Sequence, residues 1–247
     1  MADSSPPGPA PSQPLAASVP GIGEKLVIVG DGEFAEIAYQ YFTHDSPFEV
    51  VAFSTEASFL KRDSLFGLPI VPFEQVESLY TPVEHRIFIA VTHTQLNRVR
   101  RRLYRAAKQK GYRPVSYVST RAFVWHNVAI GENCFVFEHN VLQYHVRVGD
   151  NVILWSGNHV GHRSVIGDHC FLSSHVVISG YCEIGESCFF GVNSAVGNNV
   201  KVGHDCVIGA GTVVTRDTVP GKVYKAEREP SPRASSLALF KVKAADR

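Results

Sequence analysis

The chain has 247 residues, a formal net charge of +1, and 24 Lys and Arg against 23 Asp and Glu. This length is enough for two modest domains with cores of their own. The even charge balance excludes a bulk electrostatic attraction to nucleic acid or to a membrane surface. No apolar run approaches the roughly 18 residues that a membrane-spanning helix needs.

The chain opens with MADSSPPGPAPSQPLAASVPG, a stretch rich in Pro, Ser and Ala. It has no basic start and no apolar core segment, so it does not match a secretory signal. Its composition predicts a disordered tail over residues 1–23. The cysteines number five, an odd count without an export signal, and we therefore expect reduced thiols in a cytoplasmic protein.

Residues 24–117 alternate between short apolar runs and helical patterns. KLVIVG, FEVVAF, GLPIV and RIFIAV are typical of buried strands, whereas EFAEIAYQYF and QLNRVRRRLYRAAKQKG have helical spacing. The alternation predicts a small open parallel sheet, the α/β fold class. The second helix has seven basic residues and no acidic one over residues 98–110, which we interpret as a solvated face.

A glycine-rich loop follows the first predicted strand. In VIVGDGEFAEIA, Gly30, Gly32 and Ala35 give the G-x-G-x-x-A form of the dinucleotide fingerprint. Glycines at such a loop let the backbone approach phosphates at a helix N-terminus. A lone match is weak evidence, and the domain is short for a full dinucleotide fold, so we predict only a Rossmann-like N-terminal domain.

From about Val118 the pattern changes to a period of six. Every sixth residue from Ile130 is apolar, and the residue after it is often glycine, where we expect the chain to turn sharply. This period predicts a parallel β-helix over residues 118–220, in which three six-residue sides close one triangular coil. The inward positions are Ile130, Val136, Leu142, Val148, Leu154, Val160, Ile166, Leu172, Ile178, Ile184, Phe190, Val196, Val202, Ile208 and Val214.

The cysteines all stand two residues before one of these inward positions. They are Cys134, Cys170, Cys182, Cys188 and Cys206. A buried cysteine behaves as a small hydrophobic residue. We therefore predict a structural role for them and no nucleophile, metal or disulfide role.

Two histidines lie close together in GNHVGHRSVIG, residues 157–167. His162 is two residues past the inward Val160 and is expected to point outward near an edge, whereas His159 lies on another part of the surface. A neutral imidazole near pH 7 can take a proton from an attacking group; the alternative is a surface or interface histidine. His139 and His175 share a column, but no third histidine completes a metal set, so we predict no metal site.

A Rossmann-like domain followed by an uninterrupted hexapeptide β-helix resembles bacterial sugar acyltransferases of the sialic-acid O-acetyltransferase type. Members of that family include nucleotide-sugar N-acetyltransferases of the bacillosamine and perosamine pathways. The resemblance covers about residues 24–220. It implies a left-handed parallel β-helix, acetyl-CoA as co-substrate without a metal, and a homotrimer with active sites between subunits.

The resemblance also implies roles for individual residues. His162 is the implied general base, and the backbone N–H of Gly180 faces the thioester carbonyl. Two departures from the family pattern are Arg163, where many members have Glu or Asp, and Thr55–Glu56, where members usually have two acidic residues. The implied coenzyme site comprises Gly180, Val192, Asn198, Ala210 and Lys222. The implied nucleotide-sugar site comprises Gly30, Asp31, Gly32, Glu33, Phe34, Thr55 and Glu56.

The predicted function is therefore transfer of an acetyl group from acetyl-CoA to the amino group of a nucleotide-linked 4-amino-4-deoxy sugar in the bacterial cytoplasm. O-acetylation of a sugar hydroxyl is the related alternative. A non-catalytic β-helix scaffold and a metal-dependent hydratase are alternatives of other classes. Residues 221–247 are predicted to form a C-terminal extension.

Overall fold

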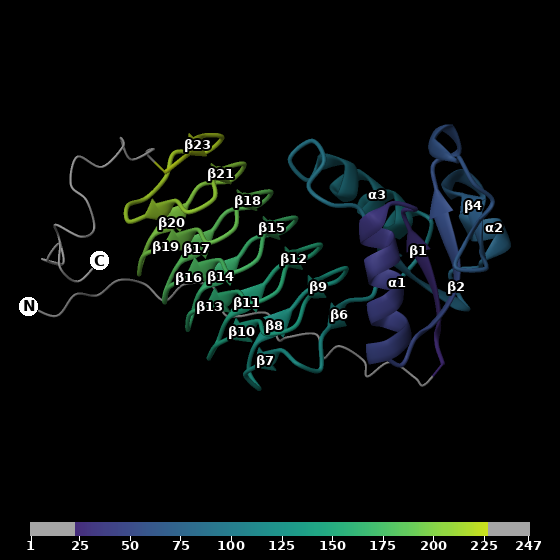
Figure 1. Cartoon of the computed structure of the whole chain (residues 1–247), viewed down its shortest axis with the longest axis horizontal. Coiled ribbons are helices and arrows are strands. Elements are labelled where there is room, and N and C mark those ends of the chain that lie inside the picture. The colour runs from purple at the N-terminus through teal and green to yellow at the C-terminus, as the bar shows by residue number, and fades with distance from the viewer. Residues whose placement is uncertain (1–22, 227–247) are drawn as a thin grey trace, which may run out of the picture.

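The structure is a computed structural model that describes residues 23–226. It has an α/β unit at one end of a long stack of triangular coils (Figure 1). The predicted tail, apart from Gly23, and most of the predicted C-terminal extension lie outside the described residues. Among the described residues, no helix combines the length and apolarity that crossing a membrane requires.

The α/β unit is built on one five-stranded sheet in the order β3-β4-β2-β1-β5. All neighbouring strands are parallel except the antiparallel pair β3–β4. The strands are β1 Lys25–Val29, β2 Glu49–Thr55, β3 Ser64–Leu65, β4 Leu68–Pro72 and β5 His85–Ile89. The helices are α1 Glu33–Asp45, α2 Val76–Leu79 and α3 Arg98–Gln109, with short 3-10 turns at Ala57–Phe59 and Phe73–Gln75.

Alternating strand residues bury both faces of this sheet. Leu26 and Ile28 of β1 point into a core that includes Phe42 of α1, whereas Val27 packs with Leu103 of α3 on the other face. The predicted open parallel sheet is therefore present, with α1 and α3 on opposite faces. Because β2 and β5 flank β1 on opposite sides, the strand order reverses beside the carboxyl end of β1.

The remainder is a left-handed parallel β-helix whose two-residue strands stack into three sheets, here called I, II and III. Sheet I comprises β7 Phe123–Val124, β10 Val141–Leu142, β13 His159–Val160, β16 Val177–Ile178, β19 Ala195–Val196 and β22 Val213–Val214. Sheet II comprises β8 Ala129–Ile130, β11 Arg147–Val148, β14 Val165–Ile166, β17 Glu183–Ile184 and β20 Lys201–Val202. Sheet III comprises β6 Tyr117–Val118, β9 Phe135–Val136, β12 Ile153–Leu154, β15 Phe171–Leu172, β18 Phe189–Phe190, β21 Val207–Ile208 and β23 Val223–Tyr224.

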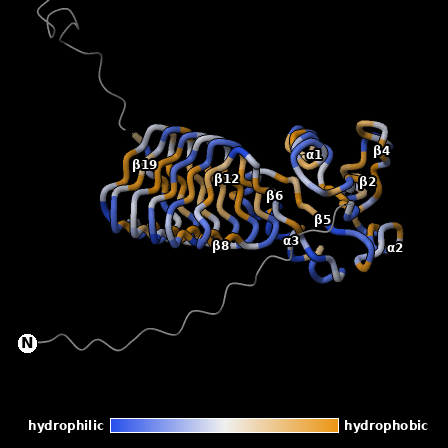
Figure 2. The backbone as a smooth tube through the Cα atoms, turned by 90° about the horizontal axis from the view of Figure 1, so that it is seen from below, coloured by the Kyte–Doolittle hydropathy of each residue, from blue (hydrophilic) through white to orange (hydrophobic). Residues whose placement is uncertain are grey.

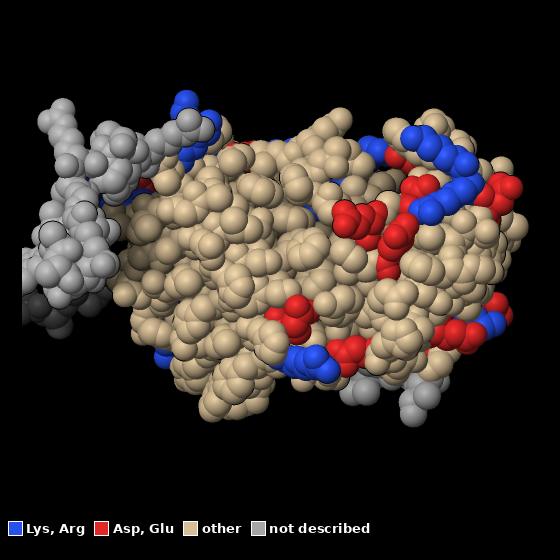
Figure 3. Space-filling view, viewed as in Figure 1, with Lys and Arg blue, Asp and Glu red and all other residues tan. Residues whose placement is uncertain are grey.

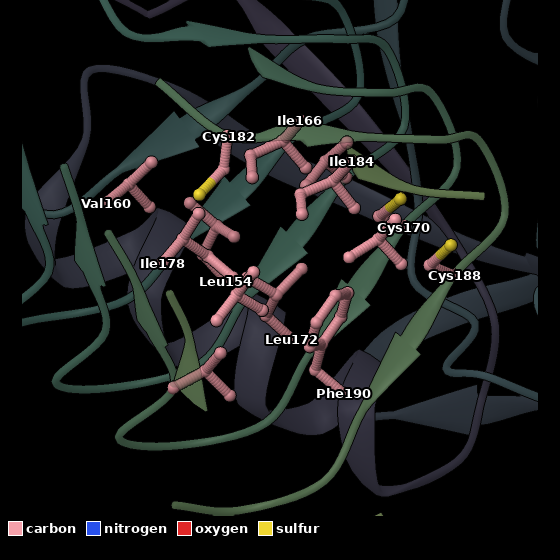
Figure 4. Close-up of a cluster of buried hydrophobic side chains, with 14 of the residues drawn as sticks. Leu154, Val160, Ile166, Cys170, Leu172, Ile178, Cys182, Ile184, Cys188 and Phe190 are labelled. Atoms are coloured by element: carbon pink, nitrogen blue, oxygen red, sulfur yellow. The ribbon is translucent and has the colours of Figure 1, made fainter. Parts of the chain in front are cut away.

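The predicted inward positions form the core of the β-helix. All of them from Val136 to Val214 are buried, and Ile130 packs against them half-buried. The hydrophobic stripes of the coils and the inward side chains are visible in Figures 2 and 4. The five cysteines are buried and free, as predicted. Strand β23 pairs with β21, so the β-helix continues into the segment assigned from sequence to the extension.

The glycines after the inward positions were expected to mark sharp turns, but the structure gives them a different role. None of them has a positive φ. A Cβ on Gly161 would lie 2.6 Å from the amide nitrogen of Gly180, and one on Gly185 would lie 2.5 Å from that of His204. Most of these glycines therefore permit adjacent coils to approach closely; Gly197, whose Cβ would meet its nearest atom at 3.6 Å, is an exception.

The sharp turn lies two residues further on. From Asn133 to Gly211, the third residue after each inward position has a left-handed backbone conformation, with φ between +52° and +76°. Asn and His tolerate this region better than most residues, which accounts for four of the histidines in the β-helix. The left-handed positions are Asn133, His139, His145, Asn151, Gly157, Arg163, His169, His175, Tyr181, Ser187, Asn193, Asn199, Asp205 and Gly211.

The first strands of sheet III are covered by the α/β unit. The outward residue Phe135 is fully buried against Phe34 and Phe42 of α1 and Phe88 of β5, with ring centroids 5.4, 5.9 and 5.4 Å away. One hydrophobic cluster thus spans both units, and the two units share part of their core.

Helix α3 lies along the corner between sheets II and III, so the prediction of a solvated basic face is only partly right: Arg102, Arg105 and Lys108 are exposed, whereas Arg100 is buried. Arg101 pairs with Glu186 at 3.4 Å, and Tyr104 donates to Asp150 at 3.0 Å. Arg98 pairs with Asp205, and Lys108 pairs with Glu132. Three of the seven basic residues of this helix, Arg98, Arg101 and Lys108, are therefore paired with carboxylates of the β-helix.

Candidate functional site

The glycine-rich loop lies at the carboxyl ends of β1 and β5, where the strand order reverses. Ligands of open α/β sheets bind in the crevice at such a point. Gly30 has φ +131°, and a Cβ there would lie 2.7 Å from the carbonyl oxygen of Ala90. No other residue fits this position, because both the backbone conformation and the space exclude a side chain.

The residues after Gly30 form the N-terminus of α1. Gly32 and Glu33 are exposed, and the amides of Glu33 and Phe34 meet no acceptor among the described residues. Free amides at a helix N-terminus favour an anion. The carbonyl of Asp31 accepts a hydrogen bond from Arg62, which also pairs with Glu36 at 3.2 Å.

Phe34 does not lie where the sequence analysis expected it. Its side chain is 5% exposed and packs in the shared cluster, with its ring centroid 5.4 Å from that of Phe135 and 6.2 Å from that of Trp155. The prediction that this side chain touches a ligand is wrong as the structure stands, because the ring is needed to join the two units. Arg62 was missed, and no spacing in the sequence connects it to the loop.

The residues at the end of β2 are placed beside the loop, as β2 neighbours β1. Thr55 is 8% exposed. Glu56 accepts two hydrogen bonds from Arg102 of α3, at 2.7 and 2.8 Å, and this pairing lowers the pKa of the Glu56 carboxyl. Glu56 is therefore a paired carboxylate that faces the basic side of α3.

His162 occupies the corner between sheets I and II, in the turn 161–164. It is exposed, as predicted. Its backbone N–H donates to Gln143 Oε1 at 3.0 Å, and its ring meets that of Tyr181 edge-on at 5.1 Å. Among residues 23–226, no group is hydrogen-bonded to either ring nitrogen.

Gly180 supports the imidazole of His162 from the next coil. A Cβ at Gly180 would lie 2.6 Å from Cε1 and 2.8 Å from Nε2 of His162. The absent side chain thus makes room for the imidazole. The N–H of Gly180 donates to Asn198 Oδ1 at 2.9 Å, so an incoming carbonyl would have to replace that amide.

Arg163 points away from the imidazole that it follows. Its left-handed backbone, φ +59°, turns the side chain so that the guanidinium lies 5.4 Å from the ring centroid of Tyr144, one coil earlier. The basic residue at this position is therefore held by a cation–π contact. No contact joins it to His162.

The predicted coenzyme residues fall on two corners. Gly180 and Asn198 lie at the corner between sheets I and II, whereas Val192 and Ala210 lie at the corner between sheets III and I. Sheet I separates the two sets within one chain. Lys222 is exposed just before β23, near the end of the stack.

An open groove of about 540 Å³ runs along sheet II toward the same end. Its lining includes Glu183 and Lys201, which pair at 3.1 Å, together with His204 and Asp217. Among the described residues, no group of three or more His, Cys, Asp or Glu side chains has the arrangement to hold a metal ion.

His93, in the loop after β5, was also missed. Its ring packs against both Phe171 and Phe189 of sheet III, with each centroid 4.9 Å away. Burial and the nearby Arg100 lower the pKa of His93. The residue connects the crevice of the α/β unit with the β-helix.

Comparison with known proteins supports the repeat pattern and the two-unit architecture. The family model for bacterial transferase hexapeptide repeats, of six repeats each, matches residues 145–180 and 181–216. A comparison with curated protein sequences gave no match.

Solved structures resemble the whole described architecture. PerB from Caulobacter crescentus, in complex with CoA and GDP-perosamine, is 27% identical with a TM-score of 0.73, over 83% of this chain and 95% of PerB. The acetyltransferase domain of PglB from Neisseria gonorrhoeae is 22% identical with a TM-score of 0.74, over 83% and 97% of the two chains. WeeI from Acinetobacter baumannii shares the fold at 18% identity and a TM-score of 0.52, over 80% and 94%.

The hexapeptide match lies on the coils that carry His162 and Gly180, and the structural match extends over both units. The chain thus carries bacterial transferase hexapeptide repeats on these coils, and it has the two-unit architecture of an acyltransferase, as in the PerB and PglB structures.

Proposed function

We propose that the protein transfers the acetyl group of acetyl-CoA to the amino group of a nucleotide-linked 4-amino-4-deoxy sugar. The observation that carries the proposal is the exposed imidazole of His162, seated over Gly180 at a corner of the β-helix. The 27%-identical PerB of Caulobacter crescentus binds CoA and GDP-perosamine in its solved structure. The crevice at Gly30–Glu33 suits the diphosphate of such a substrate.

The chemistry is direct attack. The sugar nitrogen bonds to the thioester carbonyl carbon, the C–S bond breaks, and coenzyme A leaves as the thiol. The imidazole of His162 takes the proton that the amine loses and then gives it to the coenzyme A thiolate, so that the thiol is released. The amide of Gly180 stabilises the oxyanion once the carbonyl has displaced Asn198 Oδ1. The reaction needs no metal and no covalent intermediate on the enzyme.

The proposed assembly is a homotrimer with sites between subunits. The coenzyme residues lie on two corners of one chain, so a partner that brings its own corner alongside would complete the site. Sheet I presents exposed apolar side chains, Phe123 at 52%, Val177 at 41% and Val213 at 66%. One broad face of the β-helix also carries few charged side chains (Figure 3).

The proposed location is the bacterial cytoplasm. The five cysteines are free and buried in the β-helix core, which fits a reducing compartment.

The test is acetyl transfer to a panel of UDP-, dTDP- and GDP-linked 4-amino sugars, followed by release of the coenzyme A thiol. We expect His162→Asn to lower kcat by about 10²–10⁴-fold, the usual contribution of a general base, with little change in Tm. His44→Asn removes an exposed imidazole near the C-terminal end of α1, away from the β-helix corners, and serves as the control. Full activity of His162→Asn would disprove the base assignment, and no transfer to any amino sugar would disprove the function.

A further inference from the structure

Arg100 is a fully buried arginine that the proposed chemistry does not use. It stands on α3, is 0% exposed, and has no carboxylate among its hydrogen-bond partners. Burial lowers the pKa of the guanidinium to about 9, so it remains charged at neutral pH. Burying a charge without a counter-ion costs folding free energy. The groups that the guanidinium binds show which parts of the molecule it joins.

The guanidinium joins two parts of the molecule through carbonyl oxygens. On one side, Nη1 donates to Thr92 at 2.7 Å and to Val91 at 3.3 Å, in the loop after β5. On the other side, Nη2 donates to Asn151, His169 and Cys170 in the β-helix, at 3.2, 3.1 and 3.0 Å.

Neighbouring contacts fix the two ends of the same loop. The N–H of Ile89, the last residue of β5, donates to Asn133 Oδ1 at 2.8 Å. Asn97, fully buried in front of α3, donates to the carbonyl of Cys188 at 3.3 Å. The loop 90–97 is thus attached to the β-helix at both ends and, through Arg100, near its start.

Peptide geometry then determines where the loop's amides point. Each peptide bond is planar and trans, so its N–H points opposite to its C=O. The carbonyls of Val91 and Thr92 point toward Arg100, and the N–H groups of Thr92 and His93 therefore point away from it. Within residues 23–226, neither N–H has a hydrogen-bond acceptor. The loop that carries them follows the carboxyl end of β5, beside Gly30.

We propose that Arg100 is a positioning residue, which holds the carbonyls of Val91 and Thr92 so that the N–H groups of Thr92 and His93 donate to a phosphate oxygen of a nucleoside diphosphate. The proposal rests on the proposed function, because it assigns part of the same substrate crevice. It adds a second set of backbone donors, in the loop that passes beside Gly30.

The test compares Arg100→Met and Arg100→Lys with Arg105→Met, an exposed arginine of the same helix with no ion pair among the described residues. Binding of UDP, GDP and dTDP, and of the corresponding nucleosides, is measured by calorimetry on the full chain. For the diphosphate that binds best, we expect Arg100→Met to raise Kd by about tenfold or more, as for loss of hydrogen bonds to a charged group. Nucleoside affinity should change little, and Arg100→Lys should lie between Arg100→Met and the wild type.

Each outcome decides a separate point. Equal loss of affinity for nucleoside and diphosphate would show a merely structural role, and so would unchanged diphosphate affinity in Arg100→Met; either overturns the proposal. If Arg100→Met does not fold, Arg100→Lys decides by the same comparison. Wild-type protein that binds no diphosphate overturns the proposal even if acetyl transfer occurs. Diphosphate binding that weakens selectively, without acetyl transfer, would retain the positioning role and disprove the proposed function.

Discussion

At the scale of single residues, the position of the His162 ring depends on the absence of a side chain at Gly180, in the next coil. The ring occupies the space where a Cβ of Gly180 would be. Arg163 stands where the family resemblance implies Glu or Asp, and its guanidinium lies against Tyr144. Contact with the Gly180 backbone and the ring of Tyr181 therefore positions the imidazole in this chain.

The first prediction concerns Gly180→Ala. The added methyl would lie 2.6 Å from Cε1 of His162, and the exposed ring must move aside. We expect kcat in the acetyl-transfer assay to fall by about tenfold to a hundredfold as general-base help is lost, with Tm nearly unchanged.

The matched control is Gly197→Ala, at the same corner one coil later. A Cβ there meets its nearest atom at an ordinary 3.6 Å. Equal activity of the Gly180 and Gly197 variants would show that the contact between Gly180 and the imidazole is unimportant.

The sequence alone predicted part of the candidate site. The spacing of six places His162 outward and Gly180 one coil above it, and both positions are as predicted. The side chain of Phe34 was misplaced because a motif reports the path of the backbone, whereas the burial of that ring depends on sheet III packing against α1. Arg62 and His93 reach the crevice through tertiary contacts that no sequence period encodes.

At the scale of elements, a polar ladder runs along the corner between sheets II and III. Asn133 Nδ2 donates to Asn151 Oδ1 at 2.7 Å, and Asn151 Nδ2 lies 3.0 Å from His169 Nδ1. Because an amide NH₂ can only donate, Nδ1 of His169 must accept, and the ring is neutral with its proton on Nε2. Burial, followed by Arg101, Arg100 and Arg105, lowers the pKa of His169 to about 4.

The second prediction follows from this lowered pKa. An unfolded histidine titrates near 6.5, so between about pH 6.5 and about pH 4 the unfolded chain binds more protons than the folded one. Above about pH 6.5, His169 does not reduce the free energy of unfolding. As the pH drops from there toward 4, that free energy falls by up to about 3 kcal/mol because of this residue.

Urea unfolding at a series of pH values measures the effect. His169→Asn should flatten the dependence, because Asn suits φ +64° and its Oδ1 can accept from Asn151. His175→Asn, an exposed residue at the same kind of turn, should leave the slope as in the wild type. An unchanged slope in His169→Asn would contradict the assignment.

Helix α3 shows where sequence patterns mislead at this scale. Seven basic residues without an acidic one suggest a fully solvated face, because the sequence of one helix does not show which element packs against it. The partner carboxylates Glu132, Asp150 and Glu186 are visible in the sequence at multiples of 18 residues. Only the packing of the two units brings that column to the helix.

At the scale of the whole molecule, the shared hydrophobic cluster makes the two units depend on each other. Phe135 belongs to the β-helix by sequence, but its ring is buried by α1 and β5. The period of six predicted the β-helix and its core nearly completely, since each coil repeats one rule. The docking of the units was not predicted, because it depends on outward residues that the period leaves free.

The third prediction tests this dependence by calorimetry. The wild type should unfold in one main transition. Phe135→Ala should cost about 3–5 kcal/mol, as for large-to-small substitutions in a core, and should lower the transition of the α/β unit while the β-helix transition stays near its original temperature.

Phe59→Ala is the control, since that ring is 59% exposed in the 3-10 turn Ala57–Phe59 of the α/β unit. A Phe135→Ala variant that still unfolds in one transition at the wild-type temperature would show that the units are joined by other contacts.

The length of helix α3 matches a fixed number of coils of the β-helix. Its contacts extend from Glu132 to Asp205, across four coil intervals. Deleting 18 residues within that span would keep the inward positions in step, yet would shift every later partner of the helix by one coil spacing, about 4.8 Å. Among residues 206–226, no side chain has a hydrogen bond or ion pair with α3. The stack is therefore free to lengthen or shorten at its far end, whereas its first coils are fixed in number by the length of one helix.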